Sequence, residues 1–168
     1  MKMDLIIEQL LGVIGEESEI YRSMLTVTDK ESSATVRSDL VALTKAREEK
    51  EDILVKLELI EGQRRRVVNE IADALGYPSE DFTITKISQL MGEPFGGRLS
   101  QAGAELLAVL NTVKAANHRN KLLFEHSRAL LRGSFNILSE LTHSDTVYYR
   151  TGNIQRTYQT GKCVNGDI

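Results

Sequence analysis

His143, Ser144 and Asp145 are consecutive, and they are the three residue types of a hydrolytic triad. Adjacent residues at the end of a helix do not hold the geometry in which a histidine takes the proton of a serine hydroxyl. The chain also lacks the Gly-x-Ser-x-Gly turn that exposes a nucleophilic serine in many hydrolases. Ser144 and Asp145 fit better as side chains that hydrogen-bond to the backbone where a helix ends, and we do not expect an enzyme.

Spacing suited to a metal occurs at Glu140 and His143, which match the Glu-x-x-His motif of di-iron helix bundles. Such a bundle needs a second copy of the motif and two further glutamates. Neither His118 nor His126 has a carboxylate three residues before it, and the single cysteine, Cys163, has no second cysteine to pair with. The sequence therefore predicts neither a metal site nor a cofactor.

Phosphate and nucleic-acid binding have little support. The glycines of the GEPFGG segment (92–97) are not followed by Gly-Lys-Ser or Gly-Lys-Thr, so no phosphate-binding loop is expected. Arg64, Arg65 and Arg66 point in different directions on a helix, and the net charge of −3 opposes binding to phosphates. We expect these arginines on a solvated face with salt bridges to a neighbouring helix, and no nucleic-acid partner.

The composition favours long helices. Among the 168 residues, aromatic residues make up 5% and there are two prolines, which is unlike a sheet sandwich. One cysteine excludes a disulfide framework, and no apolar run approaches the roughly 20 residues that cross a bilayer. Without a recognisable signal peptide, we expect a cytoplasmic protein that is not inserted in a membrane.

Apolar residues at steps of three and four predict where the helices lie. The first helix is predicted over residues 4–28, with Glu17 as the one polar gap in its stripe, followed by a polar connector over 29–35. The second helix is predicted from about residue 33 to Leu75, and Gly76 ends it.

A short helix, capped by Thr83 or Thr85, is predicted before the longest helix, which runs from about Leu99 to Thr142. The apolar stripe of the longest helix includes four polar residues: Asn117, Asn120, Ser127 and Ser134. Polar residues at such positions either form a hydrogen-bonded layer that fixes the register of the helices, or mark a seam weak enough to open for a partner helix. The sequence is compatible with both interpretations.

These elements predict an all-α fold, an antiparallel bundle of three long helices plus one short helix. Residues 1–142 are predicted to form the helical bundle domain, and 143–168 a flexible, disordered C-terminal tail. Because the helices are unequal, part of the last stripe, near 130–141, is expected to lack a partner within the bundle. The protein is expected to be a monomer or a homodimer.

The chain resembles the FlgN family of flagellar export chaperones. The resemblance runs through residues 40–76, the Asn117-x-x-Asn120-x-x-Leu123 motif and the segment from Thr146 to Gly152. It implies a cytoplasmic flagellar type III export chaperone without ATP or another cofactor. Its implied clients are the hook–filament junction proteins FlgK and FlgL, which it protects from aggregation and delivers to the export-gate protein FlhA.

The resemblance also implies roles for the C-terminal region, in cargo capture and, through a tyrosine, in docking to FlhA. We hypothesise that Leu131, Ile137, Leu138 and Leu141 contact the cargo. We further hypothesise that Tyr148, whose spacing to Gly152 matches the family's Tyr-x-x-x-Gly, contacts the export gate, with Tyr149 as the alternative. Burial of the leucines in the bundle is the competing interpretation, and a helical scaffold or adaptor without a secretion client is the competing function.

Overall fold

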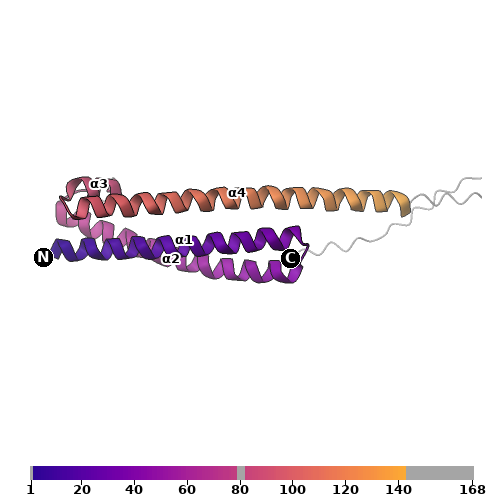
Figure 1. Cartoon of the computed structure of the whole chain (residues 1–168), viewed down its shortest axis with the longest axis horizontal. Helices are drawn as coiled ribbons and strands as arrows, with labels where there is room; N and C mark the ends of the chain where they lie inside the picture. The colour runs from indigo at the N-terminus through magenta and orange to yellow at the C-terminus, as the bar shows by residue number, and fades with distance from the viewer. Residues whose placement is uncertain (1, 79–81, 143–168) are drawn as a thin grey trace, which may run out of the picture. The chain divides into compact units, whose positions relative to one another are not determined.

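The computed structural model describes residues 2–78 and 82–142, and the side chains of that part as far as Glu140. Within these residues the structure is helical, with no strand, so the predicted all-α fold is confirmed. The helices are α1 (Lys2–Val36), α2 (Leu40–Leu75), α3 (Ile84–Leu90) and α4 (Phe95–Thr142) (Figure 1).

The chain divides into two compact units, residues 1–124 and 125–168. The helix α4 contributes its residues through Phe124 to the first unit, and its remaining residues to the second. The predicted division between residues 142 and 143, and the predicted disorder of 143–168, concern residues outside the described part and stay predictions.

In the first unit, consecutive long helices run in opposite directions, and α4 follows the direction of α1 (Figure 1). The short α3 lies beside the start of α4. Apolar side chains of all four elements meet in one cluster near this end, and a second cluster joins α1, α2 and α4 further along. The bundle of three long helices with one short helix is therefore observed as expected.

The predicted connector over 29–35 is wrong, because those residues continue α1. The turn instead lies at 37–39, where Ser38 adopts a φ of 55° and Asp39 caps α2 by accepting a hydrogen bond from the Ala42 amide at 2.9 Å. The polar residues before the turn are helical because several of them bond to other helices. Glu31, only 5% exposed, is one of these.

The predicted end of the second helix and the predicted cap of the short helix agree with the structure. Gly76 ends α2 with a φ of 72°, a left-handed conformation that glycine adopts without strain. Thr83 caps α3 and accepts a hydrogen bond from the Lys86 amide at 3.2 Å. The last helix begins at Phe95, earlier than expected. A β-carbon on Gly96 would lie only 2.6 Å from the Ser88 carbonyl oxygen, so glycine permits this close approach to α3.

A buried ion pair separates the two apolar clusters. Glu17, the polar gap in the α1 stripe, is 1% exposed and accepts a hydrogen bond from Arg64 Nε of α2 at 2.7 Å. Burial raises the pKa of Glu17 above its ordinary value, although Arg64 opposes this by favouring the carboxylate. Beside the pair, Tyr21 donates to Glu61 at 2.8 Å, and burial together with this carboxylate raises the pKa of Tyr21 to about 12.

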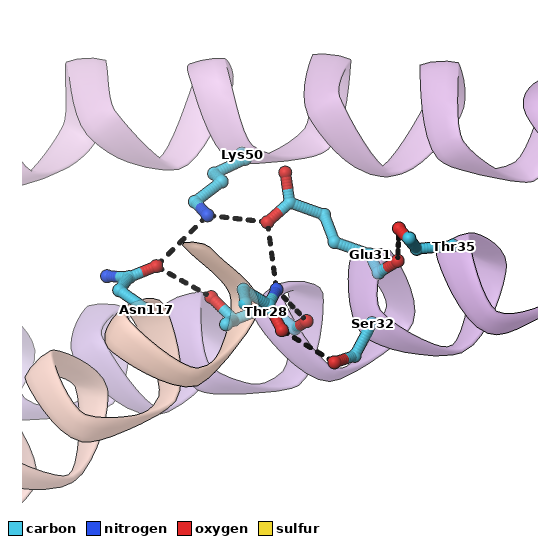
Figure 2. A network of polar contacts seen from close by, with 7 residues as sticks. Thr28, Glu31, Ser32, Thr35, Lys50 and Asn117 are labelled. Carbon is cyan, nitrogen blue, oxygen red and sulfur yellow. Dashed lines mark hydrogen bonds and ion pairs between the residues drawn. The ribbon is translucent and has the colours of Figure 1, made fainter. Parts of the chain in front are cut away.

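A second polar layer joins α1, α2 and α4 (Figure 2). Asn120 is 5% exposed and donates to the Thr28 carbonyl oxygen at 2.8 Å, while Ser32 donates to its amide oxygen. Lys50 of α2 donates to Glu31 at 2.6 Å and to the amide oxygen of Asn117 at 3.1 Å. Of the two interpretations that the sequence allowed, the structure shows the hydrogen-bonded layer for Asn117 and Asn120.

The ion pair between α1 and α2 yields a test of stability. Replacing Arg64 by methionine leaves the Glu17 carboxylate buried without its partner, and we expect unfolding free energy to fall by about 2–4 kcal/mol. This is less than for a fully buried pair because Arg64 is partly exposed to water. Replacing both residues, as Glu17→Leu with Arg64→Met, restores most of the loss. Urea unfolding followed by circular dichroism measures both, and an Arg64→Met variant as stable as the original would contradict the assignment.

The second polar layer yields a matched pair of variants within α4. Asn120→Ala removes the partner of Ser32 and of the Thr28 carbonyl oxygen, and we expect a loss of about 1–3 kcal/mol. Asn111→Ala, at an exposed position of the same helix, should change the unfolding free energy by less than about 0.5 kcal/mol. Equal effects of the two substitutions would show that the layer does not hold α4.

Candidate functional site

The α4 residues of the second unit expose apolar side chains in a density not seen elsewhere in α4. Every side chain from Arg128 to Glu140 is exposed. Five of these side chains are large and apolar, with exposed fractions between 58% and 68%: Leu130, Leu131, Phe135, Ile137 and Leu138. We name this set the α4 apolar face.

Helical spacing places these five residues on one side of α4. Leu131, Phe135 and Leu138 follow one another at steps of four and three, and Leu130 and Ile137 form a neighbouring row with a step of seven. Each step of three or four returns to the same side of the helix, so the two rows make one broad stripe. The stripe suits the apolar side of a second amphipathic helix.

The segment is helical for local reasons. Leucine, alanine and arginine, which have high helix propensity, recur through residues 128–132, and no proline interrupts α4 after its start. Ser134 donates to the Leu130 carbonyl oxygen at 3.0 Å, one turn back in the same helix. Its hydroxyl is thus satisfied within the stripe. Ser134 therefore lowers the apolar content of the face without leaving a polar group that needs a partner.

Charged residues follow one edge of the α4 apolar face. Lys121, Glu125, Arg128 and Arg132 recur at steps of four, three and four, so they share a side of the helix next to Phe135. Within the part of the chain that the structure describes, Arg128 and Arg132 make no ion pair or side-chain hydrogen bond. This edge therefore presents two cationic groups to a partner.

Three predicted cargo-binding residues belong to the α4 apolar face: Leu131 is 61% exposed, Ile137 60% and Leu138 58%. Leu141 lies in α4, but its side chain is outside the described residues, as are Tyr148 and Gly152. The hypotheses for these three residues stay predictions. Sequence reasoning missed Phe135 as a member of this face, although its step of four from Leu131 was the available signal.

The other chemical candidates occupy different places. His118 and His126 are exposed on α4, and Glu140 is exposed near its end, while His143, Ser144, Asp145 and Cys163 lie outside the described residues. Across residues 2–78 and 82–142, no three histidine, cysteine, aspartate or glutamate side chains are grouped to hold a metal ion. The four polar residues of the α4 stripe differ in burial: Asn120 is buried, Ser127 is half-buried, and Asn117 and Ser134 are exposed.

The expectation that the three consecutive arginines of α2 form salt bridges to a neighbouring helix is met by Arg64 and not by the other two. Arg64 pairs across to α1, whereas Arg65 pairs with Glu61 of its own helix at 3.4 Å and Arg66 donates to the Gly62 carbonyl oxygen. They therefore form no common basic surface.

An open hollow in the first unit has a volume of about 840 Å³. Its walls include Phe82, Leu99 and Leu106, and its two carboxylates, Glu17 and Glu61, already bond to Arg64 and to Tyr21 and Arg65. Both acidic groups of the hollow are thus engaged in contacts within the bundle.

None of the helices in the described part of the chain contains an apolar stretch of the length that a membrane span requires. The FlgN protein family model matches residues 1–156, which is most of the chain and includes the whole of α4. No curated protein and no solved structure matches the sequence. The extent of the family match, together with the helical bundle, shows that this chain belongs to the FlgN family of flagellar export chaperones.

Proposed function

We propose that this chaperone binds the terminal segments of the hook–filament junction proteins FlgK and FlgL in the cytoplasm and delivers them to the export-gate protein FlhA. The observation that carries the proposal is the α4 apolar face, in which five large apolar side chains are exposed on one side of a helix. Contiguous exposed apolar surface on a globular protein commonly marks a site of interaction with another protein.

The expected gain from covering the face is large enough for a specific complex. Complete burial of a leucine or phenylalanine side chain contributes about 1.5–3 kcal/mol. Leu131, Ile137 and Leu138 therefore supply several kilocalories per mole before the cost of ordering the client, with Leu141 one helical step beyond Leu138. A client segment that folds on binding offsets part of this gain, which keeps the complex reversible and suits a protein that must be released for export.

The proposed mechanism is protection without chemical change. Covering an amphipathic client segment removes from water the same apolar side chains that drive its aggregation. We assign contact with FlhA to Tyr148 and Gly152, because these residues follow the cargo-binding helix in the chain and match the family's Tyr-x-x-x-Gly pattern. Client and gate would then contact consecutive segments of one polypeptide.

The cargo assignment is tested by substitutions on the α4 apolar face. Leu131→Ser combined with Leu138→Ser removes apolar surface from the centre of the proposed contact, and we expect FlgK and FlgL binding to weaken by at least tenfold. The matched control is Val55→Ser with Leu59→Ser, at exposed positions of α2. Isothermal titration calorimetry with purified clients measures both variants. If the control weakens binding as much as the α4 variant, the clients do not bind this face.

The gate assignment is tested by ending the chain after Thr142. We expect FlhA binding to be lost, since Tyr148 and Gly152 are absent, while the circular dichroism signal of the helices stays nearly unchanged. Tyr148→Ala and Tyr149→Ala in the full chain identify which ring is used. Undiminished binding of the shortened chain to both FlhA and the clients would overturn the role of this segment and favour a helical scaffold or adaptor.

A further inference from the structure

The charged edge of the α4 apolar face points to the kind of segment that binds there. We infer that the face selects an amphipathic helix whose apolar side is flanked by acidic residues. The inference rests on the proposed function, because it specifies the client of the same site. It concerns the chemistry of the recognised segment and not the identity of the protein that contains it.

Charge complementarity is the first support for an acidic partner. Arg128 and Arg132 are exposed along the edge beside Phe135, and they have no ion-pair partner among the described residues. Lys121 adds a third cation and Glu125 a single acid on that side of the helix. A helix lying on the apolar face brings its own flanking residues next to this edge, where carboxylates gain from the arginines and ammonium groups are repelled.

The same charges disfavour a second copy of this segment as the occupant. Two copies packed antiparallel through their apolar faces would bring Arg128 and Arg132 of one copy close to the same cationic edge of the other. Like charges at the rim of an interface reduce its affinity and its association rate. A partner of opposite charge avoids this cost, so the edge discriminates between a client and self-association.

A lipid surface is also a poorer match than an acidic helix. Helices that lie on anionic membranes have a strongly cationic polar side. In the described residues from 125 onward, the cations Arg128 and Arg132 are balanced by the acids Glu125 and Glu140. The segment therefore has no net positive charge to attract a bilayer, and its cations are confined to one edge.

The test uses two synthetic helical peptides of about 18 residues, each roughly five turns long, with the same leucine-rich side and one tryptophan. Glutamates flank the apolar side in one peptide, and lysines in the other. Because the chain contains no tryptophan, the fluorescence of the peptide reports binding without interference. We expect the glutamate peptide to bind the full chain roughly tenfold more tightly than the lysine peptide, with the difference shrinking at high salt.

The double variant Arg128→Glu with Arg132→Glu should reverse this preference. Lys114→Glu is the matched control, because Lys114 is exposed and lies about five turns before Arg132 on the same side of α4, outside the apolar face. The control should retain the preference of the original chain. Equal binding of the two peptides, or a preference that the double variant leaves unchanged, would overturn the inference.

Failure of the inference is distinguishable from failure of the proposed function. If FlgK and FlgL binding depends on Leu131 and Leu138 but neither peptide is preferred, the face is a client site without charge selection, and the inference alone is wrong. If client binding does not depend on these leucines, the proposed function itself fails. Binding of the chain to vesicles of anionic phospholipid, lost in the double variant, would overturn the inference in favour of a membrane.

Discussion

The polar layer around Asn120 fixes which side of α4 faces α1. Apolar stripes alone allow two helices to shift along each other, because a shift of seven residues places similar apolar side chains in the same contacts. The amide of Asn120 is satisfied only where the Thr28 carbonyl oxygen and Ser32 lie opposite it. In that register, Leu99 and Leu106 join one apolar cluster and Val113 joins the other. The buried polar residues therefore determine the arrangement that the apolar residues stabilise.

The division of α4 separates the residues that stabilise the bundle from those of the proposed binding face. Its first part supplies buried residues such as Leu106 and Ala116 to the bundle, whereas the five residues of the α4 apolar face are exposed. Substitutions in the exposed part remove no contact from the two apolar clusters of the first unit. The proposed client-binding surface can consequently change in sequence while the bundle keeps its fold.

Long helices were accessible to sequence reasoning because steps of three and four continue through Glu17, Lys50 and Arg64 as if these residues were apolar. The structure explains this regularity, since the partly exposed Lys50 and Arg64 pair with buried acidic residues of α1. The same physics defeated the prediction of the 29–35 connector. A polar run is typical of a loop, but here Glu31 belongs to a buried polar layer. The partners of Glu31 lie on other helices, so the pattern of one helix does not predict that layer.

The candidate site was predictable in its location but not in its composition. Unequal helix lengths predicted that the stripe would lack partners near residues 130–141, and Leu131, Ile137 and Leu138 are indeed exposed. Phe135 was missed because the predicted rows followed only the positions that continue the bundle stripe.

A client site of the kind proposed for the α4 apolar face must bind its client without binding copies of itself. Ser134 reduces the apolar content of the stripe while satisfying its own hydroxyl, which lowers the gain from self-association. Arg128 and Arg132 add repulsion between identical faces at the edge. Both features weaken the least specific contacts and leave Leu131 and Phe135 available at the centre. Selectivity in such a chaperone thus arises as much from the residues that limit apolar self-association as from the leucines that provide the apolar contact.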